Sequence, residues 1–481
     1  MTDLSVSNLA SARARLQEIW GYPAFRPPQD TVIQALLQHQ DALIVLPTGA
    51  GKSLCFQLPA LLQAGLTLVV SPLVALMENQ VQELRDRSLP AATLHSELSK
   101  REKFRVLQAL EHQRLRLLYL SPETLLNSAV WERLARADLR INGLVLDEAH
   151  CLAQWGETFR PAYRRLGVAR QALEQSKPGH PKIPIAAFTA TANPQIQKNI
   201  HAALALRSPK VVQSSPYRQN LNLTVRTVYT PRGRKQQLLK FVRQHQRQTG
   251  LVYVRTRRDS EELAQWLQQQ GYRAVAYHAG LGASDRRQHE YAWMNNQVRI
   301  VVATNAFGMG VNKSDLRWVV HYHLPLLLTE YLQEIGRAGR DGQVAQALSL
   351  VSERTGLLDP TDQQRAQFFR QQTQRLQAQA IQVSRKIPAT GSLADVQTRF
   401  KEGAIALSYL HSQNQLQWTD PFHYRLLPTS STVNLTNAVG EPTLRKLLFN
   451  RSCRWRTIIQ QFGFRPAQSD WRCGHCDNCQ R

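Results

Sequence analysis

The stretch Leu46-Pro47-Thr48-Gly49-Ala50-Gly51-Lys52-Ser53 decides the fold of this chain. The apolar residues 42–45 before it predict a short buried strand, and residues 54–58 after it predict the start of a helix. A strand, a glycine-rich turn, Lys-Ser and a helix form the context of a phosphate-binding loop, because backbone N–H groups and the helix N-terminus point at phosphate oxygens. The stretch therefore predicts a nucleoside triphosphate site, and a chance glycine turn before a helix is the alternative.

The residues of this loop have separate tasks in a nucleotide site. The glycines let the backbone curl around phosphate oxygens, Lys52 can reach the outer phosphates, and the Ser53 hydroxyl can hold Mg²⁺. The spacing departs from the strict G-x-x-x-x-G-K-[ST] pattern, because Leu46 stands where its first glycine would be. The loop residues expected to bind the nucleotide are Thr48, Gly49, Gly51, Lys52 and Ser53.

Length and charge restrict the class of protein. A chain of 481 residues is too long for one ordinary core and predicts roughly two to four domains. Lys and Arg number 60 against 35 Asp and Glu, and the resulting net charge of +25 favours a polyanionic partner. An acidic membrane surface is the alternative, but the sequence has neither a lipidation signal nor a basic amphipathic anchor.

Neither a leader peptide nor a disulfide framework is expected. Residues 1–16 lack the apolar core of a secretory signal, and no later apolar run approaches membrane-spanning length. Six cysteines in so long a chain do not form a disulfide scaffold, and Cys55 and Cys151 stand alone in apolar segments as expected core residues. We therefore expect a reducing cytosolic location.

Strands and helix-length segments alternate after the loop. Residues 66–70, 115–120, 143–146 and 185–188 predict strands, and this alternation predicts a parallel, doubly wound sheet with its chemistry at the strand C-termini. Asp147-Glu148 follows the third of these strands. In one sheet with Lys52, Asp147 can hold Mg²⁺ and Glu148 can polarise the attacking water, whereas a solvated turn is the alternative for the pair alone.

Asp147-Glu148-Ala149-His150, together with Lys52-Ser53 and Thr189-Ala190-Thr191, resembles the motifs of second-superfamily helicases. The continuation from Cys151 to Gly156, followed by Phe159-Arg160-Pro161, is similar to the aromatic-rich loop of RecQ helicases. This resemblance implies a segment that senses single-stranded DNA and couples it to hydrolysis, through Gln154, Trp155, Phe159 and Arg160. Bases stacked on aromatic rings gain about 1–3 kcal/mol each, and burial of both rings in the core is the alternative.

The resemblance also gives a role to residues ahead of the loop. Tyr22, Arg26 and Gln29 match the adenine-contacting segment of RecQ helicases, although these residues alone would equally describe a turn with a packed tyrosine. ATP is therefore the nucleotide that the resemblance implies.

A second α/β block is expected after a boundary at residues 214–225. Its predicted elements are strands at 250–254, 274–278 and 299–304 and a helix at 261–270. The segments 277–281, 305–312 and 333–342 resemble RecQ motifs, the last one most specifically. Arg337 and Arg340, three residues apart on an expected helix turn, would neutralise charge on the γ-phosphate. Gln333, Arg337 and Arg340 complete the expected catalytic set with Lys52, Asp147 and Glu148.

The chain departs from the usual RecQ layout after residue 342, where a long insert precedes Cys453. Residues 363–382 predict a long polar helix, either packed on one side or solvated as a linker. The following pattern, with a capping signature at 392–395, a helix at 404–411 and strands at 415–418 and 422–426, predicts a winged-helix-like module. Such a module binds duplex DNA or serves only in packing, and the sequence leaves both open.

Four cysteines near the chain end predict a metal site. Cys453, Cys473, Cys476 and Cys479 have the spacing of a tetrahedral zinc site and resemble the RecQ zinc module, so His475 is not expected as a ligand. An iron–sulfur cluster is the alternative. Four arginines around Trp455 are expected to add DNA affinity: Arg445, Arg451, Arg454 and Arg456. The chain stops at Arg481, so the usual downstream winged helix and HRDC domain are expected to be absent.

These patterns combine into one expected architecture. Two tandem RecA-like α/β domains (1–213 and 214–350) precede a helical linker (351–390), a winged-helix-like module (391–440) and a zinc module (441–481). The resemblance implies an ATP-dependent helicase that moves 3′ to 5′ on single-stranded DNA and unwinds duplex or forked DNA in repair and recombination, with Mg²⁺ and Zn²⁺ as cofactors. An RNA helicase and a DNA-stimulated ATPase that only regulates are the alternatives. We expect a monomer associated with the bacterial nucleoid, with a single-strand-binding protein as a candidate partner.

Overall fold

The computed structural model describes residues 9–152, 160–305, 307, 313–428, 444, 447–466, 468 and 470–480. They form two compact units. The first unit takes residues 1–46, 50–214 and 370–438, and the second takes 47–49, 215–369 and 439–481. The chain that follows the second sheet is therefore divided between the two units. Most of the insert belongs to the first unit, and the C-terminal segment belongs to the second.

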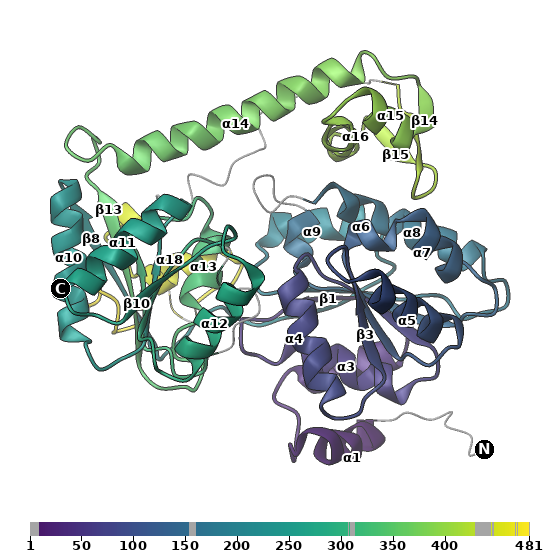
Figure 1. Cartoon of the computed structure of the whole chain (residues 1–481), viewed down its shortest axis with the longest axis horizontal. Coiled ribbons are helices and arrows are strands. Elements are labelled where there is room, and N and C mark those ends of the chain that lie inside the picture. The colour runs from purple at the N-terminus through teal and green to yellow at the C-terminus, as the bar shows by residue number, and fades with distance from the viewer. Residues whose placement is uncertain are drawn as a thin grey trace. The chain divides into compact units, whose positions relative to one another are not determined.

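A parallel sheet forms the centre of the first unit (Figure 1). In the described residues its strands are β1 (Ala42–Val45), β2 (Leu66–Val70), β3 (Ala91–Leu94), β4 (Leu117–Leu120), β5 (Ile141–Leu146), β6 (Ile185–Thr189) and β7 (Lys210–Gln213). Their order is β3-β4-β2-β5-β6-β1-β7. Val45 pairs with Thr189, and Val70 with Leu146. The phosphate loop, Asp147 and Thr189 therefore leave the sheet at one edge.

Helices cover both faces of this sheet, because successive strand side chains point to opposite sides. Leu43 and Val45 face one buried layer, whereas Ala42 and Ile44 face the other. The first layer lies against α5 (Lys100–Glu111), α7 (Ser128–Leu134), α8 (Leu166–Gln175) and α9 (Pro194–Ala203). The second lies against α1 (Leu9–Trp20), α2 (Gln29–Leu37), α3 (Lys52–Leu62) and α4 (Val74–Arg85). Short turns complete the unit: α6 (Pro122–Leu125), η1 (Ala149–Leu152) and η2 (Pro161–Arg165).

The second unit has a parallel sheet of its own. Its strands in the described residues are β8 (Leu221–Val228), β9 (Gly250–Tyr253), β10 (Ala274–Tyr277), β11 (Ile300–Ala303), β12 (Trp318–His321) and β13 (Ala345–Ser352), in the order β10-β11-β9-β12-β13-β8. One face packs against α10 (Pro231–Gln244) and α11 (Arg257–Gln269), and the other against α12 (Ala283–Met294) and α13 (Leu328–Ile335). The expected pair of RecA-like sheets is confirmed.

The insert is a winged helix attached to the first unit. Its elements are α14 (Thr361–Ser384), β14 (Thr390–Ser392), α15 (Leu393–Arg399), α16 (Gly403–Ser412), β15 (Leu416–Trp418) and β16 (His423–Leu426). The antiparallel strands take the order β14-β16-β15, and Figure 1 shows them with α15 and α16 at the C-terminal end of α14. Only Ala380 and Val383 of α14 are buried, both in the core of this fold. Most of α14 is therefore a solvated linker helix, which was one of the two alternatives left open by the sequence. Its last turns form the first helix of the winged helix.

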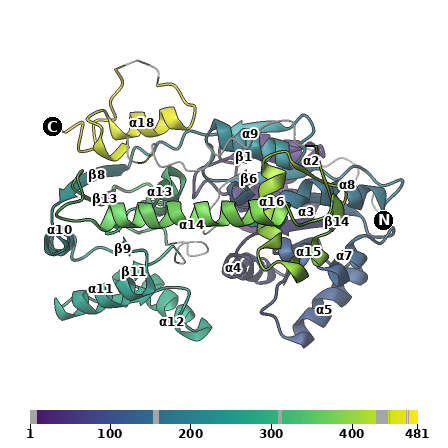
Figure 2. The ribbon, with the colours of Figure 1, turned by 90° about the horizontal axis from the view of Figure 1, so that it is seen from above.

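The C-terminal segment completes the second sheet instead of standing apart from it. Helix α18 (Arg454–Gln461) lies beside β8 (Figure 2), and Trp455 and Ile458 share an apolar core with Leu221 and Tyr331. The indole of Trp455 donates a hydrogen bond to the Leu221 carbonyl oxygen at 3.0 Å. Because β8 is an edge strand, this segment covers main-chain groups that would otherwise be open to another chain.

Several predicted elements differ in extent from the observed ones. β4 begins two residues later than expected, β5 begins two residues earlier, and α11 begins at Arg257 instead of residue 261. The boundary expected at 214–225 contains the start of β8. Strands β3, β7, β12 and β13 were not predicted. β3, β7 and β12 have four residues each, which is too few for a periodicity that separates strand from helix. Among the described helices, none is long and apolar enough to cross a membrane.

Candidate nucleotide site and metal centre

The phosphate loop is shaped by two glycines with left-handed backbone. Gly49 has φ 88° and Gly51 has φ 74°, a region that side-chain-bearing residues rarely adopt. A Cβ on Gly51 would also lie 2.5 Å from Nε2 of Gln29. Gly51 caps α3, so the loop ends at a helix N-terminus as expected.

Lys52 and Ser53 are the first two residues of α3. The Lys52 ammonium donates a hydrogen bond to the carbonyl oxygen of Leu46 at 3.2 Å. The lysine thus folds back across the turn toward the space that a phosphate-binding loop encloses. The position of both residues fits the phosphate and Mg²⁺ roles expected for them.

The three residues expected to contact adenine have different environments. Gln29 is buried, accepts a hydrogen bond from the Arg26 backbone N–H at 2.9 Å and donates to the Ala50 carbonyl at 3.0 Å. Gln29 therefore ties this segment to the phosphate loop, as an ordinary turn would not. Tyr22 is 51% exposed, and Arg26 is exposed. Both side chains are open to a ligand.

Asp147 and Glu148 directly follow β5. Asp147 is buried, and its backbone N–H donates to the Val70 carbonyl at 2.8 Å. Burial, together with the neighbouring Glu148 carboxylate, raises the pKa of Asp147 to about 7, against the lowering effect of Lys52. A bound cation would favour the carboxylate form. Glu148 has φ 51°, a strained conformation for a glutamate of the kind that collects at functional sites.

Thr189 connects two of the helicase-like motifs. Its hydroxyl lies 3.1 Å from Nδ1 of His150 and accepts a hydrogen bond from the Thr191 N–H at 3.2 Å. The same His150 nitrogen is 3.2 Å from Oε2 of Glu148. Side chains at the ends of β5 and β6 are thereby joined in one network.

Sequence reasoning missed Tyr163, which contacts the strand end that carries Asp147. The buried Tyr163 hydroxyl donates to the Asp147 carbonyl at 3.1 Å. Nearby, Arg160 donates to the Pro72 carbonyl at 3.2 Å and lies 3.7 Å from Glu123. Gln154, Trp155 and Phe159 lie outside the described residues. The sequence does show an aromatic residue just after the Trp155 segment. It does not show that the side chain of this residue points toward Asp147.

The second unit corrects the expectation for its arginines. α13 ends at Ile335, so Arg337 and Arg340 lie in the turns that follow and not on a helix face. Gly339, with φ 61°, turns the chain between them. Burial, followed by the charge of Arg337, lowers the pKa of Arg340 to about 9. Because its surroundings disfavour its charge, Arg340 would gain from a bound polyanion. Gln333 lies on α13 and is partly buried.

Glu334 was also missed, although it stands beside the expected Gln333. Both its oxygens pair with Arg255, at 2.8 and 2.9 Å, and Oε2 lies 2.7 Å from His321. Burial alone would raise the pKa of Glu334, but Arg255 and His321 together outweigh burial, and the pKa falls to about 2. Because Arg255 follows β9, this pair fixes α13, and with it the turns that carry Arg337 and Arg340, at the C-terminal edge of the second sheet.

The four predicted cysteine ligands are brought together. One sulfur from each of Cys453, Cys473, Cys476 and Cys479 lies within 4.8 Å of the others. The Cys479 sulfur is 3.4 Å from that of Cys476 and 3.8 Å from that of Cys473. A tetrahedral ZnS₄ centre with Zn–S bonds of about 2.3 Å places sulfurs about 3.8 Å apart. The donor set therefore fits zinc.

The surroundings of this centre correct one further expectation. Backbone N–H groups of Cys473 and Arg454 donate to the Cys453 and Cys476 sulfurs at 3.3 and 3.5 Å, as is usual around ligating thiolates. Arg454 is buried and pairs with both oxygens of Asp477, so it is not available to DNA. His475 lies 3.2 Å from the Tyr217 hydroxyl and outside the cysteine cluster. Arg445 lies outside the described residues.

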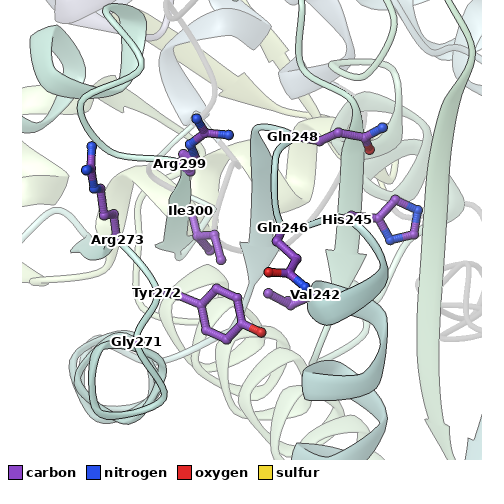
Figure 3. A pocket seen from close by; sticks show the side chains of 9 residues that line it. All are labelled: Val242, His245, Gln246, Gln248, Gly271, Tyr272, Arg273, Arg299 and Ile300. Atoms are coloured by element: carbon purple, nitrogen blue, oxygen red, sulfur yellow. The ribbon is translucent and has the colours of Figure 1, made fainter.

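A pocket of about 250 Å³ in the second unit lies away from this chemistry (Figure 3). Arg273 and Arg299, which directly precede β10 and β11, line it together with His245. Parallel α/β sheets bind ligands at the C-terminal ends of their strands, and this pocket lies at the N-terminal ends. It is therefore not the nucleotide site.

Comparisons with known proteins agree with this geometry. The family model described as DEAD/DEAH box helicase matches residues 26–199, and the helicase conserved C-terminal domain matches residues 233–342. The ATP-dependent DNA helicase RecQ of Synechocystis sp. is 50% identical over 471 residues, which cover 98% of both chains. The chain belongs to the RecQ family.

This RecQ chain is an ATP-dependent DNA helicase. It is 40% identical to the RecQ helicase of Pasteurella multocida over 69% of its own length and 51% of that protein. The probable helicase RecS of Bacillus subtilis is 39% identical, over 70% of the chain and 66% of RecS. These matches cover shorter parts of the chain than the Synechocystis match does.

Solved structures support the fold of the RecQ chain. Mss116p bound to single-stranded RNA and AMP-PNP gives a TM-score of 0.60 at 15% identity, over 87% of this chain and 90% of Mss116p. The Mycobacterium smegmatis helicase Lhr, bound to single-stranded DNA and AMP-PNP, gives 0.56 at 21% identity, over 74% of this chain and 50% of Lhr. Because the sequence identities are only 15% and 21%, these two structures show a shared two-sheet architecture and nothing further.

Proposed function

We propose that this helicase hydrolyses ATP with residues of both sheets and uses the energy to move 3′ to 5′ along single-stranded DNA. The observation that carries this proposal is the single edge of the first sheet at which the phosphate loop, Asp147 and Thr189 meet. Lys52 would bind the outer phosphates, and Ser53 and Asp147 would hold Mg²⁺. Bound Mg²⁺ would neutralise phosphate charge. Tyr22, Arg26 and Gln29 would contact adenine, and Thr48, Gly49 and Gly51 would surround the phosphates.

Three further residues complete the proposed chemistry. Glu148 would take a proton from the attacking water, because it extends from the strand end that carries Asp147. Arg337 and Arg340 would neutralise charge that develops on the γ-phosphate during transfer, with Gln333 on the preceding helix. Binding energy that is realised only in that transition state raises turnover without tightening ATP binding.

Single-stranded DNA would reach this chemistry through residues 154–160. Gln154, Trp155, Phe159 and Arg160 would sense the strand, and Arg160 touches the Pro72 carbonyl just beyond β2. A stacked base would then shift a segment that begins a few residues after Asp147. Replacing Trp155 with alanine should reduce the stimulation of ATPase by single-stranded DNA, whereas equal stimulation in the variant would assign Trp155 to the core.

We also propose a structural zinc ion bound by the four cysteines, and single-stranded and forked DNA as the substrates of a monomeric enzyme. A cytoplasmic, nucleoid-associated location suits the net charge of +25 and six cysteines without disulfides in the structure described. A single-strand-binding protein is a candidate partner.

Strand displacement tests the proposal. The enzyme should separate a DNA duplex with a 3′ single-stranded tail when Mg²⁺ and ATP are supplied, and should leave 5′-tailed DNA and RNA duplexes largely intact. Lys52→Ala is the inactive reference and Lys182→Ala, an exposed lysine of the same unit, is the matched control. DNA-stimulated ATPase without displacement would indicate a regulator, and faster displacement of RNA would indicate an RNA helicase.

A further inference from the structure

The winged helix, defined as residues 380–427, turns its usual DNA-reading surface toward the helicase itself. In helix-turn-helix folds the second helix of the motif usually enters the major groove. Here that helix is α16, which buries Ala406, Leu407 and Leu410 in the core of the winged helix itself and turns Ser408 toward η2. The Ser408 hydroxyl, 1% exposed, donates to the Pro161 carbonyl of η2 at 3.4 Å. α16 is therefore occupied by a contact within the first unit.

The wing, the turn between β15 and β16, contacts the same surface. The Pro421 carbonyl accepts a hydrogen bond from Nη1 of Arg165 at 2.7 Å. The Arg165 guanidinium also lies 5.7 Å from the centre of the Trp418 ring. Phe422 meets the ring of Trp131 edge-on, with centroids 5.6 Å apart. The two elements that would usually contact DNA, α16 and the wing, thus contact η2 and α7 instead.

η2 joins this contact to the catalytic strand end. Its residues 161–165 directly follow the segment expected to sense DNA. Tyr163, on the same turn as Arg165, donates to the Asp147 carbonyl. Arg165 is 9% exposed and Tyr163 is fully buried, so movement of this turn would disturb both contacts. A single short element therefore touches the winged helix on one side and Asp147 on the other.

We propose that the winged helix is an internal brace that positions η2, and through Tyr163 the strand end at Asp147, for the response to single-stranded DNA. The inference rests on the proposed coupling role of residues 154–160. It makes Arg165 and Tyr163 positioning residues, neither of which contacts ATP. It also assigns α16 to packing. The sequence alone had left packing and DNA binding as two open roles for the winged helix.

Variants on both sides of the contact test the brace. Arg165→Ala removes the bond to Pro421 and the cation over Trp418, and Phe422→Ala removes the ring contact from the other side. Each should lower the ratio of DNA-stimulated to DNA-free ATPase by roughly three- to tenfold. Arg165→Lys keeps a cation over Trp418 and should recover part of the ratio. Arg425→Ala, an exposed arginine on β16 that bonds only within the module, is the matched charge control and should keep it.

Hydrogen exchange provides a readout that is independent of activity. In Arg165→Ala, amides of residues 160–166 should exchange faster than in the parent or Arg425→Ala, while both variants unfold cooperatively. The proposal would be refuted if Arg165→Ala and Phe422→Ala both kept the parental ratio of DNA-stimulated to DNA-free ATPase and the parental rates of amide exchange. An equal loss in Arg425→Ala, together with weaker duplex binding, would show instead a DNA-reading wing. Full stimulation in Trp155→Ala would refute the coupling segment itself, and the exchange result would still decide whether η2 is braced.

Discussion

Individual side chains at the edge of the first sheet have environments that suit different parts of one reaction. Lys52 lies across the phosphate loop, Asp147 is buried with a pKa raised to about 7, and Glu148 holds a left-handed backbone conformation. These properties arise from burial and from neighbouring charges, and each can be removed by one substitution.

Lys52→Ala should abolish ATP hydrolysis, because the outer phosphates lose their cation. Glu148→Gln should still bind ATP but turn it over at least about a hundredfold more slowly, because general-base catalysis is lost. Turnover and nucleotide affinity measured separately check both variants. Near-parental turnover in Glu148→Gln would remove the glutamate from the catalytic set.

Arg337→Ala and Arg340→Ala should retain ATP binding and lose about a hundredfold or more in turnover, because their charge acts in the transition state. Equilibrium binding of a nonhydrolysable ATP analogue and single-turnover hydrolysis separate the two effects. Arg273→Ala, an exposed arginine of the same unit at the opposite strand ends, is the matched control. A change in ATP affinity alone would exclude that arginine from catalysis.

At the scale of elements, several of the residues proposed to act lie in short turns and not on helices. Arg337 and Arg340 lie beyond the end of α13, and η2 makes the contacts that join the winged helix to Asp147. The buried contact between α16 and η2 also contains a titratable group. Burial, followed by the charge of Arg164, lowers the pKa of His411 from 6.5 to about 4.

The winged-helix contact should therefore weaken in acid. Between these two pKa values an unfolded His411 binds more protons than the folded one, so its stabilising contribution is lost as pH falls from 6.5 toward 4. His411→Gln should lose less thermal stability than the parent between about pH 7 and pH 5. His423→Gln, an exposed histidine of the same module, should follow the parent. Parallel stability curves for His411→Gln and the parent would contradict this assignment.

At the scale of the whole molecule, the four-cysteine cluster packs against the second sheet. The Asp477 N–H donates to the Leu223 carbonyl at 3.0 Å, and the Val225 N–H donates to the Asp477 carboxylate at 3.1 Å. The cysteine loop thus lies along β8, and Trp455 fills the core beneath it. The segment expected as a zinc module (441–481) therefore belongs to the same compact unit as the second sheet.

Loss of the metal should consequently destabilise the second unit. Cys476→Ser should reduce zinc below about one ion per chain and lower the midpoint of thermal unfolding by roughly 5–10 °C. Elemental analysis and calorimetry check this result, with Cys151→Ala, a buried cysteine outside the cluster, as the control for metal content. Iron with sulfide would replace zinc with a cluster, and no metal in the parent would refute the centre.

The sequence alone determined the parts whose chemistry depends on local spacing. The phosphate loop, Asp147-Glu148 and the four cysteines were all identified, because a turn, a strand end or a ligand set restricts residues that stand close together in the chain. The two α/β blocks followed from alternating apolar runs, and the winged helix followed from a capping signature and a hairpin.

Only the tertiary structure decided which distant residues meet. The Tyr163–Asp147, Arg165–Pro421 and Arg454–Asp477 contacts join residues 16, 256 and 23 positions apart. Local patterns record that an arginine or a tyrosine is present, but not whether it ends in solvent, on DNA or against a buried carbonyl. That choice depends on the free energy of burying its polar group with a partner, and the partner is fixed only when the sheets and the winged helix are packed.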